Sequence, residues 1–147
     1  LDLSRDESNT FWKVAISNDI ESKMKFASLQ GVALQGELVG EGIQKNRYGL
    51  KGQQFFLYDV YSTITGEYYT PADRQALSQI LGIQHVPYLE IFIMYKQTAE
   101  DILRMAEGKS VLNACEREGV VFKCVSDPSI SFKAISNKFL LKSGDWC

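Results

Sequence analysis

One short stretch of the chain combines a carboxylate, two glycines and two cationic side chains, which are Glu37, Gly40, Gly42, Lys45 and Arg47. Glycine adopts positive φ angles without strain and lets the backbone come close to a ligand. A carboxylate near the end of a strand, followed by a glycine turn and two cations, suits a nucleotide site. An isolated glutamate in a strand is more often a solvated or paired side chain, so this pattern needs a second signal.

The residues around Glu37 must place it near the end of a strand. Side-chain alternation over residues 32–39 predicts that strand, and the glycines that follow predict its end. The next residues, 44–51, form a loop with a cluster of cations, namely Lys45, Arg47 and Lys51. Such a cluster is usually a solvated turn, but its place beside the glycine turn leaves phosphate contact as an equal alternative.

Residues 53–62 give the clearest strand pattern, because they are rich in aromatic and branched side chains. Strict alternation puts Phe56, Tyr58 and Val60 on one face and Phe55, Leu57 and Asp59 on the other. Core packing accounts for most of these aromatic rings. One ring at the wall of a pocket would instead stack on a nucleobase.

Capping residues mark the helices in the first part of the chain. Asn9 or Thr10 suits the start of a helix that carries Phe11 and Trp12, and both rings are expected in the core. Asn18, with a glutamate three residues later, predicts the cap of a second helix.

Two further helices have clear starts and ends. Thr70 and Pro71 suit the cap and first position of a helix that ends at Gly82, and a hairpin turn precedes it. Thr98 predicts the cap of a helix that ends at Gly108.

Three more strands are predicted, over residues 88–95, 117–123 and 130–135. Glu118, at the start of the second of these, stands where a metal ion could be held. Lys133 taken alone would be a surface lysine at a sheet edge. Strands and helices alternate irregularly with hairpin-like spacing, which indicates an α+β fold with mainly antiparallel sheets and flanking helices.

Composition limits the class of protein. The chain has 147 residues, 45% of them hydrophobic, and we expect a single domain over residues 1–147. A net charge of −2 means that any site for a polyanion must be a local patch. The longest apolar run, 91–95, is too short to span a bilayer, and no signal peptide pattern precedes it, so no membrane partner is expected.

The cysteines and the histidine do not form a metal-binding pattern. Cys115, Cys124 and Cys147 are odd in number and widely spaced, which argues against a disulfide framework and a zinc site and favours the cytoplasm. His85 has no second histidine and no cysteine close by, so we expect a structural, hydrogen-bonded histidine.

Four ordered segments together resemble the ATP-dependent RNA ligases. Residues 36–46 read Gly-Glu-Leu-Val-Gly-Glu-Gly-Ile-Gln-Lys-Asn, and residues 55–60 read Phe-Phe-Leu-Tyr-Asp-Val. Residues 117–123 read Arg-Glu-Gly-Val-Val-Phe-Lys, and residues 131–134 read Ser-Phe-Lys-Ala. The segments also resemble, more broadly, the covalent nucleotidyltransferases, which include DNA ligases and mRNA capping enzymes. The Gly-Ile-Gln-Lys-Asn version points to the nick-sealing RNA ligase branch.

This resemblance implies a ligase-type nucleotidyltransferase (adenylyltransferase) fold and a three-step reaction. An active-site lysine attacks the α-phosphorus of ATP and forms lysyl-AMP. The AMP moves to an RNA 5′-phosphate, and an RNA 3′-hydroxyl displaces it to seal nicked duplex or single-stranded ends. The chemistry requires a nucleophilic lysine, cations over the developing phosphate charge, and a divalent ion, Mg²⁺ or Mn²⁺.

The resemblance also implies roles for individual residues. Glu37 would contact the ribose hydroxyls and Tyr58 would stack on adenine. Glu118 would help to hold the metal, and Lys133, with Lys123 nearby, would neutralise the α-phosphate. A second group would orient the RNA ends or phosphates, and it comprises Gln44, Lys45, Asn46 and Lys138.

The sequence departs from the family pattern in two ways. The nucleophile of the family lies in a Lys-x-Asp-Gly motif, and that tetrapeptide is absent from these residues. The arginine expected just after it is also absent, unless Arg5 is a displaced equivalent. Some family members carry another lysine two positions after Lys133, where this chain has Ile135, with Lys138 as the nearest substitute.

Three interpretations follow. The favoured one is a domain of an ATP-dependent RNA ligase, truncated at its amino end, without its first strands and its nucleophile. The others are a natural paralogue that binds ATP or RNA without sealing it, and a fragment of a DNA ligase or capping enzyme. A missing sheet edge would also expose apolar surface and favour self-association.

Overall fold

The computed structural model describes residues 6 and 8–142. Contacts divide the chain into two compact units, Leu1–Val86 (unit 1) and Pro87–Cys147 (unit 2). Arg5 and Cys147 lie outside the described residues. Unit 1 contains α1 (Thr10–Ser17), α2 (Ile20–Phe26), β1 (Val32–Gly40), η1 (Gln44–Asn46), β2 (Gln53–Ser62), β3 (Glu67–Tyr68), α3 (Pro71–Leu81) and β4 (Gln84–His85). Unit 2 contains α4 (Ala99–Ala106), β5 (Gly119–Lys123), β6 (Ser131–Ile135) and α5 (Asn137–Lys142).

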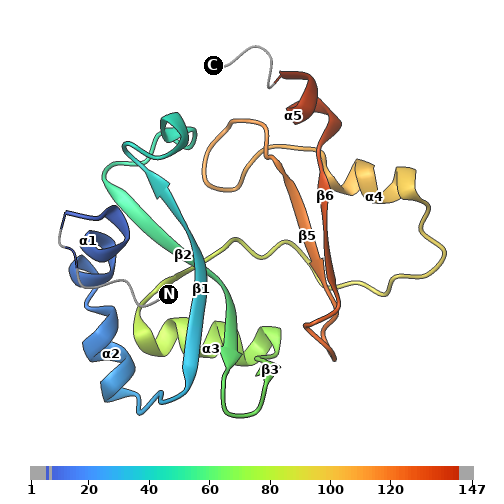
Figure 1. Ribbon diagram of the computed structural model, residues 1–147. Coiled ribbons are helices and arrows are strands. Elements are labelled where there is room, and N and C mark those ends of the chain that lie inside the picture. Colours follow the sequence, from blue (N-terminus) through green and yellow to red (C-terminus); the bar gives the residue numbers. More distant parts are fainter. Residues whose placement is uncertain (1–5, 7, 143–147) are drawn as a thin grey trace. The chain divides into compact units, whose positions relative to one another are not determined.

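The long antiparallel pair of β1 and β2 forms the centre of unit 1 (Figure 1). β3 continues β2 as an antiparallel hairpin, and the short β4 pairs with β2 in the parallel direction. The core lies between this sheet and α3, and its most buried members are Leu57, Val60, Leu77, Leu81 and Ile83. The structure therefore confirms the α+β fold with mainly antiparallel sheets.

A β-bulge interrupts β2 and changes the predicted faces. Gln35 pairs with Asp59, but the next residue of β1, Gly36, pairs with Leu57, so Tyr58 is the extra residue. Leu57 and Val60 consequently share the core, with 0% exposure each. The prediction that they lie on opposite faces was wrong, because strict alternation cannot anticipate an inserted residue.

The helix caps of unit 1 agree with the sequence, with one exception. The Asn9 side chain accepts from the Phe11 N–H at the start of α1, and the Thr70 side chain caps α3. Asn18 instead ends α1 and donates its side-chain amide to the Val14 carbonyl, so its predicted role as the cap of α2 was wrong. The Phe11 ring is 67% exposed, which also corrects its placement in the core.

Unit 2 is built on the antiparallel hairpin of β5 and β6, with α4 packed against one face (Figure 1). Ala106, Phe122 and Ala134 are buried together there. The rings of Phe122 and Phe132 stack at a centroid distance of 4.9 Å, and Phe92 meets Phe122 edge-on at 6.1 Å. Thr98 and Asp101 form a capping box at the start of α4, as the sequence predicted for Thr98.

The predicted strand over residues 88–95 is not formed. These residues have no regular secondary structure, and no described strand pairs with them. Phe92 packs into the core of unit 2, whereas Ile91 and Ile93 are 69% and 87% exposed. A run of apolar side chains favours a strand, but a strand also requires a hydrogen-bonded neighbour.

None of the described helices has the length and apolar character that crossing a bilayer requires.

Candidate functional site

Glu37 lies on β1, exposed, opposite Phe56 of β2. The residue before it must be small, because a Cβ on Gly36 would lie 2.2 Å from Cζ of Phe55 and 2.6 Å from the Phe56 carbonyl oxygen. The Phe55 ring therefore covers the backbone at Gly36. This packing fixes the strand immediately beside the carboxylate.

The β-bulge gives Tyr58 its position. Its neighbours Leu57 and Asp59 are buried, whereas Tyr58 is 40% exposed. Bulges often occur beside binding sites, where they redirect a side chain. An exposed aromatic ring on a strand anchored by buried neighbours is suited to stacking on a flat ligand.

A buried ion pair supports the strand next to Tyr58, and the sequence analysis did not find it. The Arg74 guanidinium, from α3, lies 3.2 Å from Asp59 Oδ1, and both residues are less than 10% exposed. Arg74 Nε–H also donates to His85 Nε2 at 2.9 Å, while His85 Nδ1 contacts the Val86 carbonyl oxygen at 2.6 Å. An aspartate inside an apolar strand was the available signal, since a buried carboxylate needs a partner.

His85 is the structural, hydrogen-bonded histidine that the sequence predicted. Burial lowers the pKa of His85 below its usual value of 6.5, and the neighbouring Arg74 charge lowers it further. Arg74 donates to Nε2, so His85 must be neutral with its proton on Nδ1 to keep both contacts.

The glycine turn after β1 has the backbone geometry that the sequence predicted. Gly40 and Gly42 have φ angles of +118° and +77°. A Cβ on Gly40 would lie 2.0 Å from the Gly52 carbonyl oxygen, and the Glu41 N–H donates to that oxygen at 2.8 Å. Close approach between the two arms of the loop thus requires glycine at position 40.

Three consecutive non-glycine residues then take left-handed backbone conformations. The φ angles are 43° at Gln44, 58° at Lys45 and 49° at Asn46. The Asn46 side chain closes the loop, since it accepts from the Leu50 N–H and donates to the Leu50 carbonyl. This closed turn leaves the Gln44 and Lys45 side chains exposed. Left-handed conformations are strained for residues other than glycine and often occur at functional sites.

Unit 2 brings its predicted residues to one face of the β5–β6 hairpin. Lys133 pairs across the strands with Val121, and Lys123 pairs with Ser131, so the two lysines share the face opposite the core. The Lys133 amino group donates to Oε1 of Glu118, the residue before β5. The side chains of Lys133 and Glu118 are 47% and 38% exposed, so solvent reaches this pair.

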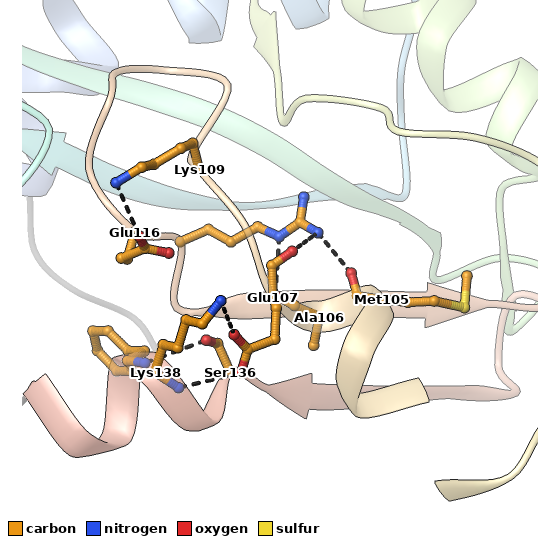
Figure 2. Close-up of polar contacts among 9 residues, drawn as sticks. Met105, Ala106, Glu107, Lys109, Glu116, Ser136 and Lys138 are labelled. Atoms are coloured by element: carbon orange, nitrogen blue, oxygen red, sulfur yellow. Dashed lines mark hydrogen bonds and ion pairs between the residues drawn. The ribbon is translucent and has the colours of Figure 1, made fainter. Parts of the chain in front are cut away.

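Lys138 has a different partner. Its amino group lies 3.0 Å from Oε2 of Glu107, at the end of α4, and Figure 2 shows these two side chains directed toward each other. The hydrogen bond to Glu107 raises the pKa of Lys138, and the same bond lowers the pKa of Glu107. Ile135, where some family members have lysine, lies on the Lys133 face opposite Gly119. Lys138 is thus held at the end of α4 by Glu107.

Cys115 and Cys124 are free thiols. A hydrogen bond with the Ser126 hydroxyl lowers the pKa of Cys124. Within the described residues, no cluster of three or more histidine, cysteine, aspartate or glutamate side chains is arranged to hold a metal ion.

The geometry thus yields two sets of predicted residues. The set in unit 1 consists of Glu37, Tyr58 and the turn at Gln44, Lys45 and Asn46. The set in unit 2 consists of Glu118, Lys123 and Lys133.

Comparisons with known proteins agree on one family. Residues 2–139 match the RNA ligase family. No curated protein gives a significant match. The chain is similar to solved structures of an RNA ligase from Naegleria gruberi. A lysine-to-alanine mutant with ATP and Mn has 41% identity and a TM-score of 0.90, and the match covers 98% of this chain and 44% of that ligase chain.

Two further structures of the same ligase give similar values. A glutamate-to-alanine mutant with AMP and Mn has 40% identity and a TM-score of 0.90, with 98% of this chain and 44% of that chain covered. The ligase with PPi has 40% identity and a TM-score of 0.89, and the match covers 98% of this chain and 43% of that chain. The present chain therefore spans less than half the length of these ligase chains.

Proposed function

This chain belongs to the RNA ligase family, and we propose that it forms part of the nucleotidyltransferase domain of an ATP-dependent RNA ligase. Such a ligase joins an RNA 3′-hydroxyl to a 5′-phosphate and uses ATP with Mg²⁺ or Mn²⁺. The observation that carries the proposal is that the family motifs fold into two strand pairs, each with its candidate contact residues exposed or partly exposed.

In unit 1 we assign the nucleoside contacts. Tyr58 stacks on adenine, because the bulge leaves its ring 40% exposed between buried neighbours. Glu37 accepts hydrogen bonds from the ribose hydroxyls, because its exposed carboxylate can only accept. The solved ligase structures with ATP and AMP support an adenine nucleotide as the ligand.

In unit 2 we assign the phosphate contacts. Lys133 and Lys123 neutralise phosphate charge from one face of the hairpin. The ion pair of Lys133 with Glu118 is solvent-accessible, and such pairs contribute about 1 kcal/mol or less. Lys133 can therefore exchange Glu118 for a phosphate oxygen at little cost.

The residues of unit 2 fit a divalent ion that is held mainly by the nucleotide. Glu118 supplies one carboxylate, and no further acidic cluster lies within the described part of the chain. Mg²⁺ commonly binds one or two carboxylates, several waters and substrate phosphates, so one protein carboxylate is sufficient. When bound, the ion adds positive charge at the phosphates.

We assign RNA contacts to the turn in unit 1 and to one lysine of unit 2. Gln44 and Lys45 project from a strained, closed turn, and Asn46 holds that turn through its contacts with Leu50. Lys138 remains a candidate for RNA contact, although it must share its charge with Glu107.

Equilibrium titration of the chain with ATP and MnCl₂ tests the nucleotide assignment. Tyr58→Ala should weaken binding about tenfold, since stacking contributes about 1–3 kcal/mol per base, while Tyr58→Phe should bind like the unmodified chain. Glu37→Gln should weaken binding about tenfold, because hydrogen bonds to charged groups contribute about 1.5–3 kcal/mol.

Two matched variants control for general effects on folding. Tyr88 is 41% exposed, close to the 40% of Tyr58, and Glu67 is an exposed glutamate on β3, in the same sheet as Glu37. Tyr88→Ala and Glu67→Gln should leave the affinity for ATP unchanged. Equal losses in the controls and the site variants would contradict the assignment.

A second candidate function is nucleotide binding without self-adenylylation. It is favoured by the absence of Lys-x-Asp-Gly from these 147 residues. Intact-mass spectrometry after incubation with ATP and MgCl₂ tests what both candidates share, because neither places the nucleophilic lysine among these residues. This chain should gain no AMP, and an adduct on any lysine would overturn the assignment of the nucleophile to a residue outside it.

We further propose a cytoplasmic location, because Cys115 and Cys124 are free thiols. Self-association remains a prediction from exposed apolar side chains such as Ile91 and Ile93. Analytical ultracentrifugation tests it, and a concentration-independent monomer would contradict it.

A further inference from the structure

Arg117, the residue before Glu118, makes contacts that the proposed function does not use. Its Nε–H donates to the Ala106 carbonyl at 3.0 Å, and its Nη2 donates to the carbonyls of Met105 at 2.6 Å and Glu107 at 2.5 Å. These carbonyls lie at the end of α4, where the helix supplies no further N–H donors. One guanidinium therefore caps three consecutive carbonyl groups.

The backbone of Arg117 is attached to the same place. Its N–H donates to the Gly108 carbonyl at 3.0 Å. Farther along the loop that joins α4 to β5, Lys109 lies 2.9 Å from Glu116, and Figure 2 shows this pair apart from the contact of Glu107 with Lys138. The two ends of the loop are thus joined to each other, and Arg117 links the loop to α4.

Glu118 is held between this anchor and β6. Its carbonyl accepts from the Ser136 N–H at 2.8 Å, and its carboxylate accepts from Lys133. α4 itself is fixed on the hairpin, because Ala106 is fully buried against Phe122 and Ala134. A continuous series of contacts runs from the core of unit 2 through α4 and Arg117 to the backbone of Glu118.

We propose that Arg117 is a positioning residue for Glu118, which it holds beside Lys133 so that its carboxylate can receive a metal–nucleotide complex. This inference rests on the proposed function of Glu118. Outer contacts of this kind matter because a carboxylate bound at one point can rotate away from its ligand. The planar fork of arginine reaches several carbonyls at once, and the single ammonium of lysine does not.

A simple structural cap would behave differently from a positioning residue. A cap stabilises α4 and affects every ligand of unit 2 to a similar degree. A residue that acts through Glu118 affects only the binding that needs the Glu118 carboxylate. Two measurements therefore distinguish the roles: the dependence of ATP binding on the metal, and a cycle that combines the Arg117 and Glu118 substitutions.

The test is titration of the whole chain with ATP, in MnCl₂ and separately in EDTA. We expect Arg117→Ala to weaken binding about tenfold in MnCl₂, as Glu118→Gln does, and to have no effect in EDTA. The double variant should bind no more weakly than Glu118→Gln alone. Lys109→Ala, which removes a neighbouring loop cation that is 63% exposed, should bind normally in both solutions.

Two results would overturn the inference. The first is that Arg117→Ala binds Mn·ATP as tightly as the unmodified chain. The second is that it weakens binding equally in EDTA and in the Glu118→Gln background, which is the behaviour of a cap alone. Thermal unfolding of each variant identifies a variant that fails to fold. In that case Arg117→Lys, which keeps the charge without the fork, replaces it and should show a smaller loss confined to MnCl₂.

Failure of the proposed function gives a different result, because the unmodified chain then binds no ATP in either solution. The positioning role is then decided by the ¹³C NMR signal of the Glu118 carboxylate. Arg117→Ala should move this signal toward its position in Lys133→Met, where the ion pair is lost. An unmoved signal would contradict the role.

Discussion

The two strand pairs hold their candidate residues by different means. In unit 1, Tyr58 lies between residues that are almost fully buried, and the Asp59–Arg74 pair beneath is closed to solvent. In unit 2, Glu118 and Lys133 lie on the open face of a two-stranded hairpin and pair with each other in contact with solvent. Buried packing therefore fixes one set of residues, and polar contacts hold the other.

This difference suits the two proposed tasks. A rigid support favours binding by a base-stacking ring, because a ring that is already fixed loses little conformational entropy when the base binds. Groups that meet phosphate and metal must exchange partners, and exposed ion pairs exchange at little cost. We therefore expect loss of the buried ion pair in unit 1 to affect stability most strongly, and loss of the exposed ion pair in unit 2 to affect mainly metal–nucleotide binding.

The largest expected effect comes from the buried ion pair. Arg74→Leu leaves Asp59 buried without its partner, and this should lower the free energy of unfolding by about 3–5 kcal/mol. Lys133→Met, which breaks the exposed pair in unit 2, should change it by less than about 1 kcal/mol. Urea denaturation followed by circular dichroism checks both variants. Similar losses would contradict the contrast between the two regions.

A smaller effect is expected from the glycines beside the two glutamates. Overpacking commonly costs about 1–3 kcal/mol, and the two positions should fall at different ends of this range. A Cβ on Gly119 would lie 2.1 Å from the Ala134 carbonyl oxygen, whereas the nearest atoms to a Cβ on Gly36 belong to the Phe55 ring. Gly119→Ala should destabilise more, because its close contacts are all with paired backbone, whereas at Gly36 the ring can turn aside and the nearest backbone atom, the Phe56 carbonyl oxygen, lies farther away at 2.6 Å.

Hydrogen–deuterium exchange locates the effect of each glycine variant. Gly119→Ala should speed exchange in β5 and β6, and Gly36→Ala should speed it in β1 and β2. Greater destabilisation by Gly36→Ala would show that Phe55 cannot move.

Acidification should weaken unit 1 through His85. Burial lowers the folded-state pKa of His85 below 6.5, so the unfolded chain binds the proton first as the pH falls. The stability present above about pH 6.5 is therefore lost below it, until the folded-state pKa is passed. The charged groups nearest His85 are Arg74, which opposes protonation, and Asp59, which favours it.

Denaturation midpoints measured between about pH 7.5 and about pH 5.5 check the histidine prediction. His85→Gln should have a flatter pH profile than the unmodified chain. If the stability of His85→Gln depends on pH as steeply as that of the unmodified chain, a group other than His85 causes the loss of stability in acid.

The smallest effect is expected from restoring a cation on the face of Lys133. Ile135 is 38% exposed there, and Ile135→Lys should tighten binding of Mn·ATP by up to about fivefold. The gain should fade at high salt, because exposed charges are screened. Titrations at two salt concentrations check this, and a gain that does not depend on salt would point to a change in packing instead.

Local signals in the sequence predicted the elements, and longer-range pairing explains most of the errors. Thr70 and Thr98 cap helices as expected, because a cap depends on residues only three positions away. The bulge at Tyr58 depends on how β1 aligns with β2, which no alternation pattern contains. Residues 88–95 have the side chains of a strand but lack a partner in the described part of the chain.

The candidate residues were found by family resemblance, and their supports were not. Glu118 and Lys133 lie in recognisable motifs, and the hairpin register brings them together. Arg74 lies outside the motifs, and Arg117 opens the 117–123 motif without any sign of its contacts, because a guanidinium that meets a distant carboxylate or a helix end leaves no periodic pattern. Asp59 within an apolar strand was the one available sign of a buried partner.

The most direct test of the division between the two regions is titration with parts of the nucleotide. Adenosine and Mn·tripolyphosphate are each titrated against the unmodified chain, Tyr58→Ala and Lys133→Met. The account predicts that Tyr58→Ala weakens only adenosine and that Lys133→Met weakens only tripolyphosphate. If both variants weaken the same ligand, or neither variant weakens either one, the assignment of base and phosphate contacts to separate regions is wrong.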